Sequence, residues 1–179
     1  LWWVADSPAP ASAADGAFLL SASGGVRVAR GAELLPARAD MALQPGDRVA
    51  VPDGAEARLG FADDTTRLDL RGPADLRLHR GGRGKKVELL RGVLSADVAR
   101  QEEAFVVASP HAEFRADQGR LLVEAAPAFA RLEVREGAAV LLRPDGRSLR
   151  VPAEHYALAG RDVELAARPL VPGEPATGA

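Results

Sequence analysis

Two copies of a proline-aspartate-glycine tripeptide constrain the fold of this chain more than any other feature. They lie at Pro52-Asp53-Gly54 and Pro144-Asp145-Gly146, and short runs of alternating apolar and polar residues flank each copy. Proline presets φ at about −65°, aspartate bonds its own backbone, and glycine accepts the positive φ that closes a bend. Because tight turns between alternating segments usually join β-strands, the pattern predicts a fold built from β-hairpins, with a hairpin connection at each tripeptide.

Alternating segments follow one another along most of the chain at the short spacing typical of an all-β domain. In one segment Leu68 and Leu70 fall on one side of the strand and charged residues fall on the other, as a half-buried sheet requires. No long window keeps a helical period, although Glu33–Met41 and Arg100–Glu103 could each form a helical turn. We expect an all-β fold of many short antiparallel strands and hairpins, either β-solenoid-like or a distorted sandwich. The expected strands are Gly25–Arg30, Arg48–Val51, Glu56–Ala62, Arg67–Leu70, Asp75–His79, Lys86–Arg91, Leu94–Ala99, Ala104–Ala108, Glu113–Ala116, Arg120–Glu124, Ala130–Arg135, Ala138–Leu142, Ser148–Val151 and Asp162–Ala167.

Composition divides the chain into one central domain and two flanking segments. The domain is expected over residues 17–167, after a stub and an alanine-, proline- and serine-rich linker over residues 1–16 and before a proline-rich tail over residues 168–179. The apolar stub holds Trp2 and Trp3, and tryptophan favours the membrane–water interface. Two interpretations stay open: these residues end a transmembrane anchor that lies outside this chain, or they pack on the domain as part of the linker.

Composition also argues against several kinds of partner and chemistry. The net charge is −2 and no segment is strongly basic, so nucleic acid is not an expected partner. The chain has no cysteine, which excludes disulfides, thiolate metal sites and cysteine nucleophiles. The three histidines, at positions 79, 111 and 155, lie far apart and lack the spacing of a helix-borne metal pair. We therefore predict no catalytic residue, no cofactor and no metal site, and a binding or structural module instead of an enzyme.

Several segments, taken in order, resemble the motifs of the FecR-type domain. In the first half they are Gly25–Gly31, Leu43–Val49 and Ala57–Thr65. In the second half, Leu89–Leu94 resembles the family's leucine-x-x-glycine turn, Phe105–Ala112 its phenylalanine-x-valine-x-threonine-proline-x-alanine strand, and Arg131–Gly137 its valine-x-glutamate-glycine turn. The family's aspartate-glycine-threonine turn reads Asp63-Asp64-Thr65 here, so we expect Asp64 to take the glycine's place with a positive φ.

The resemblance implies an extracytoplasmic, β-rich domain. It is similar to the outer part of membrane-anchored regulators that receive a signal from an outer-membrane receptor and relay it to a cytoplasmic sigma factor. It implies a protein partner in the cell envelope, a periplasmic or other extracytoplasmic location, and contact with the membrane only through an N-terminal anchor outside this chain. The tripeptides and the resemblance together predict structural turns at Gly46, Asp47, Pro52, Asp53, Gly54, Asp63, Asp64, Thr65, Gly92, Gly137, Pro144, Asp145 and Gly146.

Two functions of different class remain. The first is a protein-interaction module that binds its partner at an uncovered strand edge, and the strands beside the linkers, Gly25–Arg30 and Asp162–Ala167, are the expected edges. The second is a glycan-binding or structural β module of a larger cell-envelope protein. Glycan binding needs exposed aromatic platforms, whereas most phenylalanines lie in or beside apolar runs and are expected in the core.

Overall fold

The computed structural model describes residues 16–79 and 84–171, and these residues form β-strands joined by turns and loops, without an α-helix. The prediction of an all-β fold is therefore confirmed. The fourteen strands of the described residues are β1 (Ala17–Ser23), β2 (Arg27–Arg30), β3 (Glu33–Pro36), β4 (Arg48–Val51), β5 (Glu56–Phe61), β6 (Arg67–Leu78), β7 (Lys86–Val98), β8 (Phe105–Ala108), β9 (Glu113–Ala116), β10 (Gly119–Ala125), β11 (Phe129–Leu142), β12 (Ser148–Pro152), β13 (His155–Gly160) and β14 (Arg168–Pro169).

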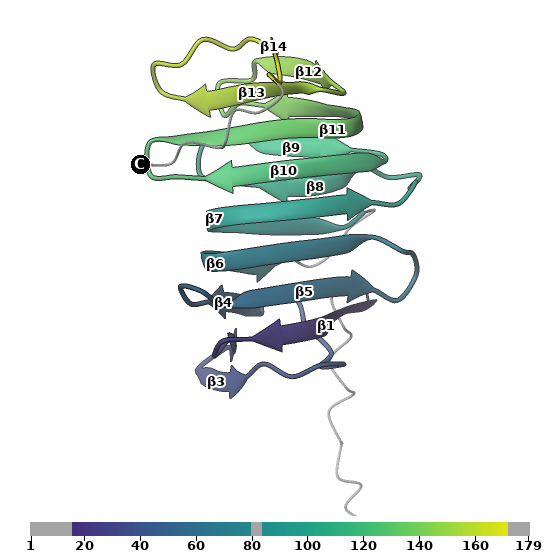
Figure 1. Cartoon of the computed structure of the whole chain (residues 1–179), viewed down its shortest axis with the longest axis vertical. Coiled ribbons are helices and arrows are strands. Elements are labelled where there is room, and N and C mark those ends of the chain that lie inside the picture. Colours follow the sequence, from purple (N-terminus) through teal and green to yellow (C-terminus); the bar gives the residue numbers. More distant parts are fainter. Residues whose placement is uncertain (1–15, 80–83, 172–179) are drawn as a thin grey trace, which may run out of the picture.

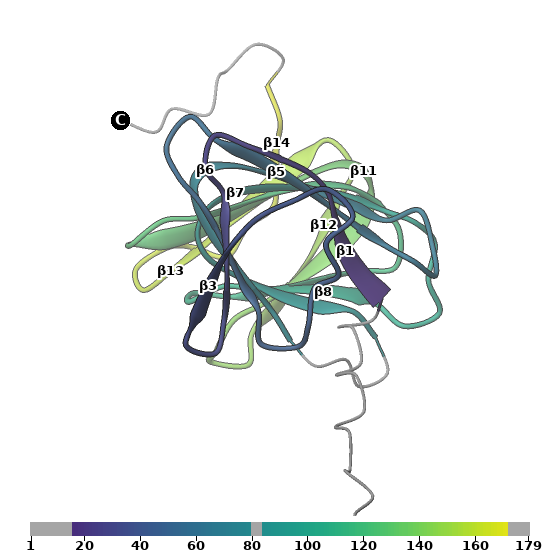
Figure 2. The ribbon, with the colours of Figure 1, turned by 90° about the horizontal axis from the view of Figure 1, so that it is seen from below.

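Hydrogen bonds join all fourteen strands into one network that folds into two facing sheets. The first sheet has the order β1-β5-β6-β7-β10-β11-β13-β14, and the second has the order β3-β2-β4-β6-β7-β8-β9-β11-β12. All pairs are antiparallel except β7 with β8, which run parallel. The strands lie across the long axis of the molecule, one above another (Figure 1), and the view along that axis shows the backbone surrounding a central interior (Figure 2).

Three long strands belong to both sheets because each bends near its middle. The first half of β6 pairs with β5 and its second half with β4. The first half of β7 pairs with β8 and its second half with β10. The first half of β11 pairs with β10 and β13, and its second half with β9 and β12. As a result β7, β10, β11, β9 and β8 close into a ring.

The bends coincide with the positions where the sequence predicted that strands end. Gly72-Pro73 lies inside β6, Gly92 inside β7 and Gly137 inside β11. The predictions that Gly92 and Gly137 form turns between separate strands were therefore wrong. At Gly92 the φ angle is +97°, and a Cβ atom there would lie 2.5 Å from the carbonyl oxygen of Pro73. Glycine at this position lets β6 and β7 approach each other at their bends without ending the pairing.

The two tripeptides have different roles. Pro144-Asp145-Gly146 joins β11 to β12, which pair with each other, so the predicted hairpin is present. Pro52-Asp53-Gly54 joins β4 to β5, which lie in different sheets and pair with opposite halves of β6, so the hairpin predicted there was wrong. Gly54 and Gly146 both have positive φ, at +71° and +85°. The local bend follows from these residues, but the partners of the flanking strands depend on the bend in β6.

Other differences concern segments with weak or misleading local signals. The helical turns expected at Glu33–Met41 and Arg100–Glu103 are absent, and Glu33–Pro36 is strand β3, paired with β2. Tertiary pairing here overrides the helix preference of glutamate, leucine and alanine. The strand expected at Asp162–Ala167 is not formed, whereas β1 and β13 were not predicted. The sequence of β13 is rich in alanine and glycine, which have low strand preference.

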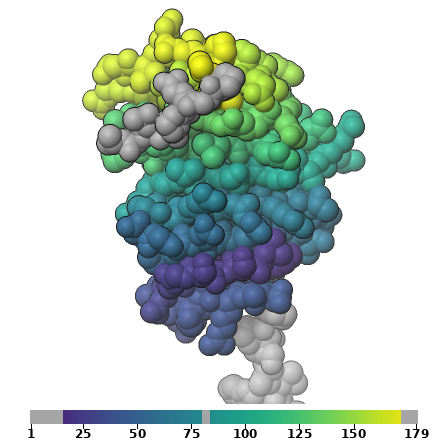
Figure 3. All heavy atoms as spheres, viewed as in Figure 1, coloured from purple at the N-terminus to yellow at the C-terminus, as the bar shows by residue number. Residues whose placement is uncertain are grey.

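Inward-facing aliphatic and aromatic side chains fill the space between the two sheets. Phe105 and Phe114 are fully buried, and the rings of Phe61 and Phe105 meet edge to face with centroids 6.0 Å apart. Leucines of β5, β6, β7 and β10 complete this core. The N-terminal strands lie at one end of the long axis and the C-terminal strands at the other (Figure 3). The strands at these two ends have edges that face away from the rest of the molecule.

Candidate functional site

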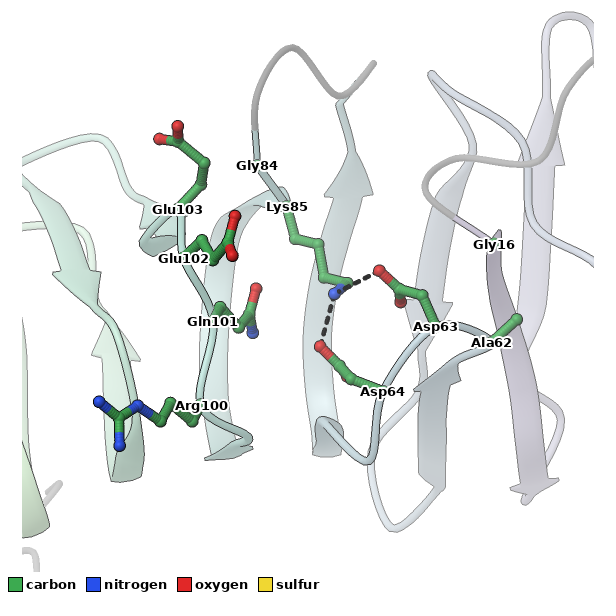
Figure 4. Close-up of a pocket in the computed structure, with 10 residues that line it drawn as sticks. All are labelled: Gly16, Ala62, Asp63, Asp64, Gly84, Lys85, Arg100, Gln101, Glu102 and Glu103. Atoms are coloured by element: carbon green, nitrogen blue, oxygen red, sulfur yellow. Dashed lines mark hydrogen bonds and ion pairs between the residues drawn. The ribbon is translucent and has the colours of Figure 1, made fainter.

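The predicted turn at Asp63-Asp64-Thr65 lies in a polar cluster built around a buried lysine. The side chain of Lys85 is only 7% exposed, and its Nζ atom lies 2.6 Å from Asp64 Oδ2 and 2.9 Å from Asp63 Oδ2. Nζ also lies 5.3 Å from the centroid of the Phe61 ring. Figure 4 shows the ammonium group pointing at both carboxylates, at the edge of a pocket of about 520 Å³ whose other wall is the 100–103 loop.

Thr66, and not Thr65, anchors this turn. Thr66 is buried and Thr65 is exposed. The Thr66 amide donates to Asp64 Oδ1 (2.7 Å), and Thr66 Oγ1 accepts from the Ala99 amide and from Gln101 Nε2, each at 3.1 Å. Asp64 does not have the positive φ expected of a glycine substitute, because its side chain shapes the turn by accepting the amide two residues ahead.

The charges in this cluster stabilise one another. Burial alone would raise the pKa of the Asp64 carboxyl group, but hydrogen bonds from Lys85 and Thr66 outweigh burial and hold that pKa below its usual value. Burial likewise disfavours the charged form of Lys85, yet its hydrogen bonds to Asp64 and Asp63 raise its pKa above the usual value. Both groups are therefore charged at neutral pH. The cluster ties the 62–66 turn to the start of β7 and is structural in character.

Further buried carboxylates pair with arginines elsewhere in the fold. Asp47 accepts from Arg30 at 2.6 Å and from the Gln44 amide at 2.8 Å, next to Gly46. Asp75 lies between Arg48 and Arg91, at 2.9 and 2.7 Å. Burial raises the pKa of Asp75, but the hydrogen bonds from the two guanidinium groups outweigh that effect and lower it.

The predicted site residues do not come together into one site. The turns at Gly46-Asp47, Pro52–Gly54, Asp63–Thr65 and Pro144–Gly146 lie on different connections along the molecule. Trp2 and Trp3 lie outside the described residues. Within the part of the chain that the structure describes, no cluster of three histidine, aspartate or glutamate side chains is suited to a metal ion. Over the same residues, no helix has the length and hydropathy needed to cross a membrane.

Among the described residues, β12 pairs with β11 alone, so its outer edge has no partner strand. The Arg143 amide donates to the Arg147 carbonyl group at the β11–β12 hairpin, and hydrogen-bonded pairs alternate along antiparallel strands. Leu149 and Val151 therefore bond to β11, whereas the N–H groups of Ser148 and Arg150 point away from it. The residues on this outer row are exposed.

The other strands at the two ends of the molecule leave fewer unpaired backbone groups at their outer edges. In β3 the same alternation directs only the Leu34 N–H outward, since Pro36 has none. The outer edge of β1 bonds to the loop that precedes β4, through the Leu19 and Asp40 amides among others. Strand β13 pairs with β14 on its outer side. Neither edge predicted from the sequence is present, because β2 lies between β3 and β4 and residues 162–167 are not a strand.

Sequence reasoning missed Lys85, Thr66 and the edge of β12. Lys85 and Lys86 are adjacent and are the only lysines of the chain. Because side chains alternate along a strand, one of the two should point inward. A buried lysine needs an acidic partner, and Asp63 and Asp64 are adjacent carboxylates that could supply it. The position of β12 at an edge depends on strand order, for which local sequence carries no signal.

Comparison with known proteins identifies the family. A family model described as FecR protein matches residues 47–140. No curated protein matches the chain. Two crystal structures, both described as a candidate anti-sigma factor from Parabacteroides distasonis ATCC 8503, resemble the fold with a TM-score of 0.61. The identity is 19% for the structure at 2.50 Å resolution and 18% for the structure at 1.65 Å.

The similarity to these structures covers 68% of this chain and 59% of each solved chain. At this identity the match shows a shared fold. The matched part therefore spans about three fifths of the length of the solved relatives.

Proposed function

The chain belongs to the FecR protein family, and from that premise we propose that it is the extracytoplasmic, protein-binding domain of a membrane-anchored sigma regulator. In this role the domain carries out no chemical reaction. It binds a partner in the cell envelope, and the bound state is relayed through a membrane anchor outside this chain. The description of the two similar structures as anti-sigma factors supports the regulatory part of the proposal.

The observation that carries the binding role is the outer edge of β12. The backbone N–H groups of the exposed Ser148 and Arg150 can donate hydrogen bonds to an added strand. Strand addition is a common way for a β domain to bind an extended segment. The edge lies at the C-terminal end of the molecule, away from the end that holds β1. A partner could therefore bind there without disturbing the paired core.

A glycan-binding function has no comparable support. Phe61, Phe105 and Phe114 are buried in the core. The ring of Tyr156 is covered by the Arg131 guanidinium group, whose Cζ atom lies 4.5 Å from the ring centroid. These aromatic side chains do not form an exposed platform for a sugar.

The absence of cysteine from the chain allows a direct test in cells. In the full-length protein, Ser148→Cys adds a thiol at the outer edge of β12, and Asp97→Cys adds one on the exposed outer face of β7 as a control. A membrane-impermeant maleimide should label both variants in cells whose outer membrane has been permeabilised and whose inner membrane is intact. A benzophenone attached to the thiol of the Ser148→Cys variant should cross-link to a protein on irradiation, and one attached to the thiol of the Asp97→Cys variant should not.

Two results would contradict the proposal. Labelling of both thiols only after the cells are lysed would place the domain in the cytoplasm. Labelling without any protein cross-link specific to position 148 would remove the binding role from this edge.

A further inference from the structure

The outer face of the second sheet carries a row of side chains that ends at the open edge of β12. Arg115 of β9, Val140 of β11 and Arg150 of β12 are directly opposite one another in register. Directly opposed residues in antiparallel strands point to the same face, so the two arginines lie on either side of Val140. A strand added to β12 would continue this row, and its residue opposite Arg150 would be the next member.

The charge at this edge is positive and incompletely neutralised. Arg115 pairs with Glu113 at 2.6 Å, and Arg147 pairs with Asp145 at 2.7 Å. In contrast, the exposed Arg150 guanidinium group has no acidic partner among the described residues. Arg150 also borders a groove of about 740 Å³ on the same face, which Arg100 and Arg115 line together with the small apolar side chains of β11. Glu102 and Asp117 line this groove as well.

The inner face of β12 has the opposite character. Val151 is fully buried, and Leu149 is partly buried and packs against the core. On an added strand, every second residue would therefore meet the apolar side of Leu149 and Val151. The residues between them would meet Arg150 and solvent.

From this geometry we infer that the edge of β12 binds an extended segment of a partner protein in which acidic and apolar residues alternate, with a carboxylate opposite Arg150. This inference rests on the proposed function and names the chemistry of the partner. Oppositely charged residues that face each other across two strands stabilise the pairing, and like charges destabilise it. The main-chain hydrogen bonds to Ser148 and Arg150 hold the segment, and the alternation selects its sequence.

One register in which a second copy of this chain could pair at the same edge is unfavourable. In a two-fold antiparallel pairing centred on the outward-facing residues, Arg150 would face Arg150 and Ser148 would face Pro152. The first pair is repulsive, and Pro152 has no N–H group to donate. Self-pairing in this register is therefore disfavoured, whereas an acidic strand placed opposite Arg150 meets no such repulsion.

Binding of synthetic peptides to the full chain tests this inference. The probes are capped (Val-Glu)4, capped (Val-Lys)4 and a (Val-Glu)4 in which every amide is N-methylated, each followed by fluorescence anisotropy. We expect saturable binding of (Val-Glu)4 alone. Arg150→Glu should weaken that binding about tenfold and favour (Val-Lys)4, and Arg150→Gln should give an intermediate loss. The matched control Arg67→Glu, on the outer face of β6 in the first sheet, should leave the affinity unchanged.

Each contrary result overturns a distinct part of the inference. Equal affinity for the two charged peptides, or an equal effect of Arg150→Glu and Arg67→Glu, would show that Arg150 does not select the segment. Undiminished binding of the N-methylated peptide would exclude strand addition. No saturable binding up to about 1 mM would remove the site. A cross-link at position 148 in cells together with a loss of charge selectivity would leave the proposed function standing and refute the partner chemistry alone.

Discussion

At the scale of single residues, Lys85 and Lys86 show how neighbouring identical side chains acquire different roles. The Lys85 side chain is 7% exposed and bonds two carboxylates, whereas Lys86 is 39% exposed and bonds Glu113. Removing one partner of a buried ion pair leaves an uncompensated charge, and exposed pairs contribute little.

We therefore expect Lys85→Met to lower the free energy of unfolding by about 2–3 kcal/mol. The matched variant Lys86→Met should lower it by less than about 1 kcal/mol. Urea unfolding followed by circular dichroism measures both. Equal losses would show that the Lys85 cluster does not stabilise the fold as described.

A second prediction at this scale concerns pH and the buried Asp75. Its pKa is lower in the folded chain than in the unfolded chain, so its ionised form stabilises the fold above the unfolded pKa. That contribution is lost as the pH falls through the folded pKa. Asp75→Asn should cost about 2 kcal/mol at pH 7, and the gap between wild type and variant should narrow on acidification below about pH 4. A gap that stays constant between pH 7 and pH 2 in urea unfolding would contradict this assignment.

At the scale of strands and turns, two glycines with positive φ differ in their surroundings. A Cβ atom on Gly54 would meet no atom within 4 Å, whereas one on Gly92 would lie 2.5 Å from a backbone oxygen of β6. Gly54→Ala should therefore cost about 1 kcal/mol from backbone strain alone. Gly92→Ala should cost at least about 2 kcal/mol, because β6 and β7 must also separate at their bends. Similar melting temperatures for the two variants would show that the close approach at Gly92 does not constrain the chain.

The strands also show how much of the fold could be predicted from the sequence alone. Alternation in segments such as Leu68–Leu70 predicted the β class and most strand positions, because that pattern is local. The glycines at positions 72, 92 and 137 marked real changes of direction, but glycine cannot tell a bend within a strand from a turn between strands. Which strands pair, and hence which edge is open, depends on contacts distant in sequence. For that reason the edge predicted at Gly25–Arg30 was wrong and the edge at β12 was missed. The edge predicted at Asp162–Ala167 was wrong because no strand forms there.

At the scale of the whole molecule, the sharing of β6, β7 and β11 between two sheets should make the domain unfold as one unit. Neither sheet can separate without breaking strands that belong to the other. Environment-sensitive dyes on Ser23→Cys in β1 and on Ser148→Cys in β12 report on opposite ends. Their urea transitions should coincide. Two separate midpoints would show that the ends fold independently.

The proposed binding role depends on the outer edge of β12 pairing with a partner strand. Amide hydrogen exchange of the full chain, resolved by residue, measures this directly. In the free protein the Ser148 and Arg150 amides should exchange rapidly, while the Leu149 and Val151 amides, bonded to β11, should be protected. When the partner captured at position 148 is added, the Ser148 and Arg150 amides should become protected as well. If the partner binds while both amides continue to exchange as fast as before, the partner does not add a strand to β12, and binding at this edge is refuted.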